Sequence, residues 1–578
     1  MLYTVIKKNM YQDSVNLMLL TNHLSSTEGV DQVSVMMGTP ANIDIFKNSG
    51  LYTEQLDDAS PNDLCIVVDT DSESVVDQVV EGVDDFVSNQ STQSKQSMIP
   101  ITRTWEMAQN KLSNANLAVI SIAGEHAASE ANKALDRNLN VFLFSDNVPL
   151  DDEVQLKRKA QEKGLIVMGP DCGTGILHEV PIAFANVVEK GNIGVVGASG
   201  TGIQEITTII ARKGGGISQA IGTGGRDLSA DVGAITAIKG LEVLAEDPAT
   251  EVIVFVSKPP APEVRDKVVE VFKTLGKPVV AVFMGEKPRE DDDNVHYAWT
   301  LEETALKALE FAGSRDADLD QLISENDGFR KMKTNPEQRF IKGYYCGGTL
   351  ALEAAMIVED AFNIDPSAEH PDGKMLEHGG TEIIDLGDDA YTQGRAHPMI
   401  DPALRVEMVK KAANNPETAV ILLDNVVGYG GHEDMAGVFA PVIKEAKDQA
   451  EADNRDIVFI ASVTGTEGDP QVYEEQVKKL EDAGAVVAAS NAQATRLAVG
   501  IISYLDSTEP FEQANSNQAA NGTDAVKELI SDKPRVINIG LKGFAETIRE
   551  NGGEVVQYQW APIAGGNKRL AKILEKLK

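Results

Sequence analysis

One loop dominates the sequence: Gly191-Asn192-Ile193-Gly194-Val195-Val196-Gly197-Ala198-Ser199-Gly200-Thr201-Gly202-Ile203-Gln204-Glu205-Ile206. An apolar run leads into glycines and small hydroxyl residues and then into isoleucines at helical spacing, which is the pattern of a strand, a tight loop and a helix. Glycine lets the backbone approach a ligand closely, and the first N–H groups of the helix point into the loop with the positive end of its dipole. The pattern predicts an anion site, best suited to phosphate or carboxylate, at Ser199, Gly200 and Thr201.

A second glycine cluster, Gly222-Thr223-Gly224-Gly225-Arg226-Asp227, follows another short apolar run. If the two clusters end neighbouring strands, they share a pocket, to which Gly224 and Gly225 contribute. Neither loop is a Walker A motif, because no Gly-Lys-Ser/Thr follows, and neither is a complete GxGxxG motif. A packing turn without a ligand is therefore the alternative interpretation.

The composition limits the fold and the partners. At about 150 residues per domain, 578 residues are enough for three or four domains. A hydrophobic share of 42% with 49 glycines is typical of an α/β protein. A net charge of −37 disfavours binding to nucleic acid and to anionic membranes. The widely spaced Cys65, Cys172 and Cys346 have no metal-ligand spacing and suit a reduced cytoplasm, and no apolar run approaches the ~20 residues of a membrane span.

Apolar runs alternate with helical patterns along the chain, which predicts an α/β protein with doubly wound parallel sheets. Polar segments at 326–336 and 509–521 read as linkers, whereas the polar segment 88–97 is expected to interrupt a domain. The predicted units are a Rossmann domain at 1–190, flavodoxin-like domains at 191–330 and 337–507, and a strand-helix-strand-helix tail at 522–578. In the third unit, Gly430 and Gly431 follow the apolar run 420–424 and are expected at the carboxyl end of a strand.

Several further motifs carry a family resemblance. They are Met168-Gly169-Pro170-Asp171-Cys172-Gly173-Thr174, Ser257-Lys258-Pro259-Pro260, Asp385-Leu386-Gly387-Asp388-Asp389, His397-Pro398-Met399-Ile400-Asp401-Pro402 and Gln559-Trp560-Ala561-Pro562-Ile563-Ala564-Gly565-Gly566. Together with the glycine clusters they resemble the FdrA family over essentially the whole chain. That family is similar to the α subunit of succinyl-CoA synthetase fused to the C-terminal domain of its β subunit. The resemblance implies a CoA-binding-like Rossmann domain at 1–190 and two synthetase-like flavodoxin domains after it.

The resemblance also implies a site and a reaction. In succinyl-CoA synthetase two facing helix N-termini hold the phosphate of a phosphohistidine. By similarity, Ser199, Gly200 and Thr201 stand for one of them and Gly430 and Gly431 for the other. The resemblance to FdrA-type proteins implies that this chain acts in allantoin and purine catabolism. In that role it would be one subunit of an oxamate carbamoyltransferase that has two further subunits. Oxalurate and phosphate would give oxamate and carbamoyl phosphate.

The sequence departs from the synthetase pattern at several places. The segment from Ile6 to Ser14 contains no glycine, which argues against CoA binding at the first strand. In succinyl-CoA synthetase a carboxylate orients the active histidine, and Lys258 falls near the corresponding position in this sequence. No unit is long enough for an ATP-grasp domain, so this chain alone is expected not to use ATP. His296 falls near the phosphohistidine position but lacks a Gly-His-Ala-Gly frame, so we interpret it as a core or surface histidine. Cys172 is a thiol nucleophile or, as we prefer, a small residue in a tight turn.

Basic residues are needed to neutralise small anions in so acidic a protein. We expect Lys258 and Arg226 to act together on the transferred group or its phosphate, with Arg395 as a further cation. The main hypothesis is carbamoyl transfer within a hetero-oligomer, with phosphate or carbamoyl phosphate as substrate and no required cofactor or metal. The alternatives are an acyl-CoA synthetase that uses a phosphohistidine and a non-catalytic scaffold or regulatory subunit.

Overall fold

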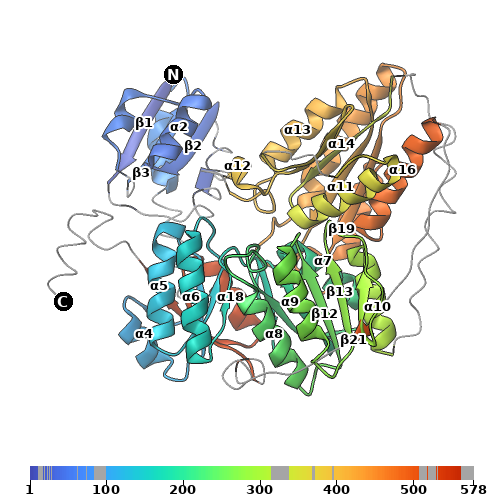
Figure 1. Cartoon of the computed structure of the whole chain (residues 1–578). Coiled ribbons are helices and arrows are strands. Elements are labelled where there is room, and N and C mark those ends of the chain that lie inside the picture. The colour runs from blue at the N-terminus through green and yellow to red at the C-terminus, as the bar shows by residue number, and fades with distance from the viewer. Residues whose placement is uncertain are drawn as a thin grey trace.

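The structure is a computed structural model. It describes residues 1–8, 10, 17, 20, 21, 24, 27, 29–60, 63–72, 74–83, 99–313, 337–366, 372–392, 396–506, 517, 518, 529 and 532–560. Their strands form four sheets, of three, eight, six and six strands. In Figure 1 the N-terminal sheet and the unit 340–506 stand above a broad lower body that contains the other two sheets. The predicted α/β fold with several parallel sheets is confirmed.

The first glycine loop lies in the eight-stranded sheet, whose order is β21-β14-β13-β12-β10-β11-β8-β9. The five strands β14, β13, β12, β10 and β11 run parallel in the flavodoxin order. At the edges β21, β8 and β9 pair antiparallel. The strands are β8 (Thr174–Leu177), β9 (Val180–Ala183), β10 (Lys190–Ala198), β11 (Ile217–Gly222), β12 (Val252–Ser257), β13 (Val279–Phe283), β14 (Asn294–Ala298) and β21 (Asn517–Gln518), and the helices are α7 (Gly200–Arg212), α8 (Ile235–Glu246), α9 (Pro262–Phe272) and α10 (Leu301–Phe311).

The unit 340–506 repeats the flavodoxin order in a six-stranded sheet, β16-β17-β15-β18-β19-β20. All its neighbours are parallel except β16, which pairs antiparallel with β17. The strands are β15 (Phe340–Tyr345), β16 (Lys374–His378), β17 (Thr381–Asp385), β18 (Thr418–Val426), β19 (Val458–Thr464) and β20 (Val486–Ala488). The helices are α11 (Gly348–Phe362), α12 (Asp389–Thr392), α13 (Ala403–Ala413), α14 (Met435–Ala452), α15 (Tyr473–Asp482) and α16 (Asn491–Asp506).

One apolar core runs through both flavodoxin-like units. It includes Ile203 and Ile206 of α7 together with Leu350 of α11 and Ala498 of α16. Polar contacts cross the same boundary, because the buried Glu205 accepts hydrogen bonds from the Thr464 hydroxyl at 2.7 Å and from the Asn491 amide at 2.9 Å. The two units are therefore held in a fixed relation, which fixes α7 relative to α11.

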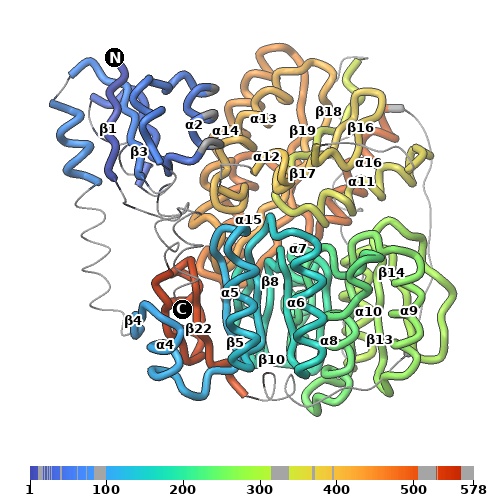
Figure 2. Tube along the Cα trace, turned by 60° about the vertical axis from the view of Figure 1, so that its left-hand side comes forward, coloured from blue at the N-terminus to red at the C-terminus, as the bar shows by residue number. Residues whose placement is uncertain are grey.

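A third parallel sheet is built from two distant parts of the chain. Its order is β4-β23-β22-β5-β6-β7, and every neighbouring pair is parallel. Counted from β22, this is the 3-2-1-4-5-6 order of a Rossmann fold, so the domain is circularly permuted in the chain. Figure 2 shows β22 beside β5. The strands are β4 (Ile101–Thr102), β5 (Leu117–Ile120), β6 (Asn140–Leu143), β7 (Val167–Met168), β22 (Arg535–Ile539) and β23 (Glu554–Tyr558), and the helices are α4 (Trp105–Lys111), α5 (Gly124–Asp136), α6 (Leu150–Lys163) and α18 (Lys542–Glu550).

The N-terminal residues form a separate sheet instead of the start of a Rossmann domain. The strands β1 (Leu2–Lys7), β3 (Leu64–Asp69) and β2 (Gln32–Met37) pair antiparallel in that order, accompanied by α2 (Pro40–Asn48) and the 3₁₀ helix η1 (Glu54–Asp58). In β2 buried residues alternate with less buried ones, which is typical of an antiparallel sheet covered on one face.

The sheets therefore group the strands differently from the predicted units 1–190 and 522–578. The predicted unit 1–190 divides after the N-terminal sheet, and the predicted unit 522–578 supplies two strands, β22 and β23, of the Rossmann sheet. The last helix of the strand-helix-strand-helix tail predicted at 522–578 would follow β23 (Glu554–Tyr558), and residues 561–578 lie outside the described residues. Within the described part of the chain, no helix combines the length and apolar character that a membrane crossing requires.

Candidate functional site

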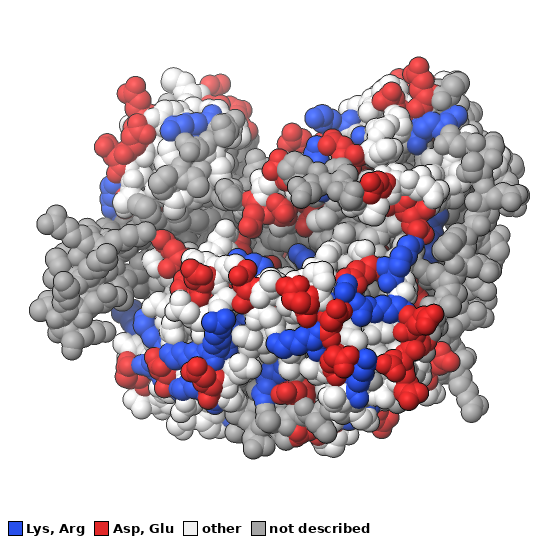
Figure 3. Space-filling model, viewed as in Figure 1, with Lys and Arg blue, Asp and Glu red and all other residues white. Residues whose placement is uncertain are grey.

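The carboxyl ends of parallel strands from three sheets meet at one cleft, which we call the central cleft. Its charged residues are Asp146 after β6, Asp171 after β7, Arg226 after β11, Lys258 after β12, and Asp385 and Asp389 at and after the end of β17. The charges of Lys258, Asp146, Asp389 and Arg226 all act on Asp171, which places these groups around it. Figure 3 shows a hollow between the lower body and the two upper parts, bordered by acidic and basic side chains. Open parallel sheets bind ligands at such strand ends.

The predicted anion loop opens α7 and faces a second helix N-terminus. The Ser199 hydroxyl caps α7 by accepting a hydrogen bond from the Gly202 amide at 2.9 Å. It also hydrogen-bonds the Thr349 hydroxyl in the first turn of α11 at 2.5 Å. A methyl group added at Gly347 would lie 3.0 Å from Thr201 Cγ2. Because the first amides of a helix have no partner inside it, the positive ends of α7 and α11 converge here.

The helix N-terminus that contacts α7 is thus that of α11, preceded by Cys346-Gly347, while the role predicted for Gly430 and Gly431 before α14 stays a prediction. A methyl group on Gly430 would lie 2.8 Å from Phe184 Cδ1, so this glycine allows a close packing contact. The following helix, α14, is capped by protein groups, because Asp434 accepts from the Gly437 amide and Gln476 from the Ala436 amide, each at 3.0 Å. The sequence has a strand and a glycine pair before both helices, and the Ser199–Thr349 contact joins α7 to α11.

Carboxylates surround the N-terminus of α11. Asp424 accepts hydrogen bonds from the amides of Cys346 at 2.9 Å and Gly347 at 2.8 Å, and it pairs with the buried Arg405 at 2.7 Å. Asp385 lies beside Gly348 and accepts from the Gly387 amide at 2.8 Å. Burial raises the pKa of Asp385 to about 7, against the opposing effect of Lys258. At neutral pH Asp385 can therefore hold a proton, which lets it donate as well as accept a hydrogen bond.

Lys258 lies between carboxyls of two units. A methyl group on Gly225 would lie 3.3 Å from Asp171 Oδ2 and 3.8 Å from Lys258 Nζ, so these three residues gather at one point. Gly224, at φ +84°, packs against the Pro170 carbonyl and supports the same turn. Asp171 is exposed to the cleft, yet the protein around its carboxyl partly desolvates that group and raises its pKa to about 6. Within the described residues no ion pair or hydrogen bond occupies the Lys258 ammonium, which leaves it available to an anion.

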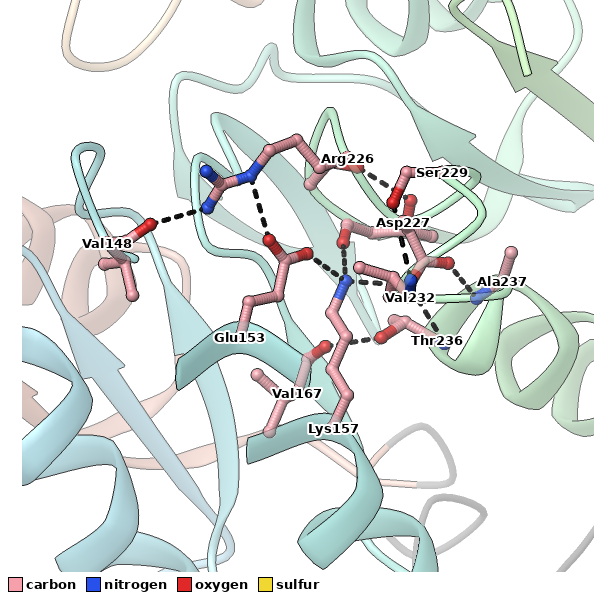
Figure 4. Close-up of polar contacts among 12 residues, drawn as sticks. Val148, Glu153, Lys157, Val167, Arg226, Asp227, Ser229, Val232, Thr236 and Ala237 are labelled. Atoms are coloured by element: carbon pink, nitrogen blue, oxygen red, sulfur yellow. Dashed lines mark hydrogen bonds and ion pairs between the residues drawn. The ribbon is translucent and has the colours of Figure 1, made fainter. Parts of the chain in front are cut away.

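Arg226 is held by the permuted Rossmann domain (Figure 4). Its Nε contacts Glu153 of α6 at 2.9 Å, and its Nη2 donates to the Val148 carbonyl at 2.7 Å. The fully buried Lys157 contacts the other oxygen of Glu153 at 2.9 Å and Asp227 at 2.7 Å. Asp227 in turn accepts from the first amides of α8. The predicted pair of Arg226 and Lys258 thus shares the cleft, with Arg226 already paired to Glu153 and Lys258 not.

Of the remaining predicted residues, His296 and Cys172 are buried, and the turn of Cys172 reaches α7, because a methyl group added at Gly200 would lie 3.6 Å from Gly173 Cα. His296 is buried on β14 with its ring centroid 3.5 Å from that of Phe311, and neither of its nitrogens has a hydrogen-bond partner in the described structure. Burial lowers its pKa to about 3. Cys172 is buried in the turn after β7, and burial raises its pKa to about 12, so the thiol is not activated. Arg395 lies outside the described residues.

His397 is a cleft residue that sequence reasoning did not select. Its Nδ1 accepts a hydrogen bond from the Met399 amide at 3.2 Å, and its ring lies 5.8 Å from that of Phe184. Burial lowers the pKa of His397 to about 4, so the ring is neutral. The signal was present in the motif His397-Pro398-Met399, in which proline stiffens the turn that closes on the imidazole.

The glycine loop sought after the first strand stands instead after β22. There Gly540-Leu541-Lys542-Gly543 leads into α18 at the point where the strand order reverses, between β22 and β5. Gly540 has φ +121°, and a side chain there would lie 2.6 Å from the Ser121 carbonyl. The Leu541 amide donates to the Ser121 hydroxyl at 2.9 Å. The switch point is where Rossmann folds bind nucleotides, so the argument against CoA drawn from Ile6 to Ser14 applied to the wrong strand.

Comparison with known proteins gives the family. A CoA-ligase model matches residues 344–501, a CoA binding domain model matches 188–285, and a model described as AllF, heavy metal-associated domain, matches 1–100. YahF of Escherichia coli K12, an uncharacterised protein, is 40% identical over 510 residues, which are 86% of this chain and 97% of YahF. The chain belongs to the FdrA-like family that includes YahF.

Other relatives of this FdrA-like chain are CoA ligases. The α subunit 1 of an ADP-forming succinate–CoA ligase from Archaeoglobus fulgidus is 28% identical over 231 residues, 38% of this chain and 77% of the relative. Among solved structures, ATP citrate lyase from Methanothrix soehngenii is 13% identical, with a TM-score of 0.29 over 71% of this chain and 88% of the lyase.

Within the described residues no cluster of His, Cys, Asp and Glu could hold a metal ion, and this includes the described part of 1–100.

Proposed function

We propose that this chain catalyses acyl transfer of the CoA-ligase type, in which an acyl phosphate is formed or consumed between α7 and α11. The observation that carries the proposal is the meeting of two helix N-termini through Ser199 and Thr349. Their free amides and dipoles suit a phosphate dianion. The similarity to succinate–CoA ligase α subunits and to the CoA-ligase model supports the same chemistry.

The residues of the cleft divide the work. The amides of Gly200, Thr201 and Gly348 bind phosphate oxygens, and Lys258 neutralises the charge that develops as the acyl–oxygen bond breaks. Asp385, with its pKa raised to about 7, exchanges a proton with the leaving or entering group. Breaking the acyl–oxygen bond of the acyl phosphate leaves phosphate in the cradle and transfers the acyl group to a thiol.

The permuted Rossmann domain has features that fit CoA. Gly540 provides the close backbone approach and α18 the helix N-terminus for phosphates, while Phe544 of α18 stacks edge-on against Phe144 with centroids 4.9 Å apart. When bound, CoA supplies the thiol that accepts the acyl group. The CoA binding domain model matches residues 188–285, which makes the region of α7 the other candidate for the CoA site. A variant at Gly540 distinguishes these two candidate sites.

Carbamoyl transfer is a second candidate, favoured by the carboxyls of the cleft. Asp385 and Asp171, with pKa values raised to about 7 and about 6, can be protonated at neutral pH. A protonated carboxyl matches the amide of a carbamoyl group with one donor and one acceptor. In this second reaction, oxalurate and phosphate give oxamate and carbamoyl phosphate. The FdrA resemblance implies that it takes place in the cytoplasm, in a complex with two further subunits.

The test compares two reactions of the purified full-length chain. Phosphate-dependent release of free thiol from acyl-CoA supports the ligase type, and its loss in Gly540→Val with phosphate binding intact places CoA on the permuted domain. Carbamoyl phosphate formed from oxalurate and phosphate, by the chain with its partner subunits, supports the second candidate. Neither product at saturating phosphate, with the partner subunits present, would refute both.

A further inference from the structure

The ring of His397 has a fixed proton position. Its Nδ1 accepts a hydrogen bond from the Met399 backbone amide at 3.2 Å. A ring nitrogen that accepts from an amide carries no proton, so in the neutral imidazole the proton is on Nε2. The Phe184 ring, 5.8 Å away, packs against the imidazole and restrains its plane. His397 is therefore a neutral donor with a defined direction.

The Nε2 atom of His397 lies close to the N-terminus of α11. A methyl group added at Gly387 would lie 2.7 Å from His397 Nε2, 3.0 Å from Asp385 Oδ1 and 3.1 Å from the Cys346 carbonyl. Cys346 directly precedes Gly347, the N-cap of α11. Among the described residues, the ring's hydrogen bond is the one that Nδ1 accepts, and Nε2 donates to no protein acceptor. The N–H is thus a donor without a protein partner at the mouth of the phosphate cradle.

The charge state of His397 suits recognition by direction. Burial, assisted by the nearby Arg405, lowers its pKa to about 4. The cleft already has the Lys258 ammonium, which attracts any anion. A neutral N–H adds selectivity, because it stabilises an oxygen only where that oxygen lies along the bond.

We propose that His397 binds the substrate directly, with its Nε2–H donating to an oxygen of the phosphate or of the acyl group that reacts with it. This inference rests on the proposed function, since it places that oxygen between α7 and α11. In this role His397 does not carry the phosphoryl group. Its Nε2 is protonated, and its Nδ1 lone pair is taken by Met399.

The binding test uses inorganic phosphate and the full-length chain, with affinity measured by calorimetry. His397→Leu removes the donor and is expected to weaken phosphate binding by about tenfold to a hundredfold, as for one hydrogen bond to a charged group. His397→Gln places an amide N–H near the position of Nε2 and is expected to restore affinity to within about threefold. His296→Leu, a buried histidine away from the cradle, is the matched control and should bind like the wild type. Unchanged affinity in a folded His397→Leu variant overturns the proposal.

A spectroscopic test needs no variant. In wild-type protein with ¹⁵N-labelled histidine, NMR should show a proton on Nε2 of His397 at neutral pH, with a signal that shifts as phosphate is added. A proton on Nδ1, no response to phosphate, or a phosphoryl group bound covalently to His397 would each overturn the proposal. These measurements require no turnover, so an inactive protein that binds phosphate through His397 would contradict the proposed function alone.

Discussion

Lys258 shows how one side chain can set the protonation of a site. It emerges from β12 between Asp171 and Asp385, and it lowers the pKa of both carboxyls against a larger effect of burial. Pro259 and Pro260 follow it and stiffen the backbone that presents the ammonium. Arg226 is already paired with Glu153, so among these two cations Lys258 is the one left to neutralise an anion in the cleft.

Replacing Lys258 should affect chemistry more than stability. We expect Lys258→Met to lower turnover at saturating phosphate by about a hundredfold, because a preorganised charge is lost from the site. The pKa of Asp385 should rise further, since the group that lowers it is gone. Turnover and the melting temperature are measured together, with the exposed Lys267→Met as the control. Wild-type turnover in Lys258→Met would contradict this role.

Loss of His296 should not affect turnover. Among the described residues neither of its ring nitrogens has a hydrogen-bond partner, and burial lowers its pKa to about 3. Because an unsatisfied buried polar group costs free energy, His296→Leu is expected to keep full turnover and to leave the melting temperature unchanged or raised. A fall in turnover of several orders of magnitude in a folded variant would revive a histidine nucleophile.

Local sequence predicted the residues whose placement is local. Ser199, Gly200 and Thr201 open α7 because a strand, a loop and a helix follow one another in the chain. His397 was missed because its neighbour at the cradle, Cys346, lies on another strand end, and no spacing reveals that contact. Gly430 and Gly431 were selected by similarity to the synthetase, and the sequence does not show that Asp434 and Gln476 cap the first turn of α14.

At the scale of elements, α6 is joined to the loop 222–227 by buried charge. Lys157 has no exposed surface and donates to Glu153, Asp227 and the Thr223 carbonyl, the last at 3.0 Å. Removing one member of such a network leaves its buried partners with unpaired charge, which lowers the stability strongly. The complete network contributes little to the free energy of folding. The loop that carries Gly224 and Gly225 therefore depends on a helix of another domain.

The network makes a prediction about two lysines on one helix. Lys157→Met should lower the free energy of unfolding by about 3–5 kcal/mol, because Glu153 and Asp227 lose their shared cation. Lys159→Met removes partly exposed contacts with Asp136 and Asn132 and should cost less than about 1 kcal/mol. Urea unfolding followed by fluorescence gives both values. Equal losses would show that the buried network contributes no more than the surface pair.

At the scale of the whole molecule, buried carboxyls predict a dependence of stability on pH. Burial raises the pKa of Glu353 from 4.5 to about 7, and Asp385 is raised to about 7 as well. The folded state then holds protons that the unfolded state has released, so the free energy of unfolding falls as pH rises through this interval. Glu353→Gln should flatten that fall by the contribution of one proton. Melting curves between pH 5 and pH 8 test it, and an unchanged slope would contradict it.

The two flavodoxin-like sheets could be predicted because their strands follow one another in the sequence, each with its helix. The Rossmann sheet could not, since its first two strands, β22 and β23, lie more than four hundred residues after β4. The N-terminal strands were placed correctly in sequence, but their antiparallel pairing depends on partners that hydrophobic patterns do not specify. The cleft itself is a property of all these sheets together.

The permuted Rossmann sheet has a consequence for how the protein is made. A ribosome completes β5 more than four hundred residues before β22, its neighbour in the sheet. Throughout that interval the nascent chain exposes the backbone edge of β5, which in the finished protein is hydrogen-bonded along residues 117–120. Nascent chains stalled before residue 532 should therefore recruit chaperones at this edge, and release of the completed C-terminal segment should end that association.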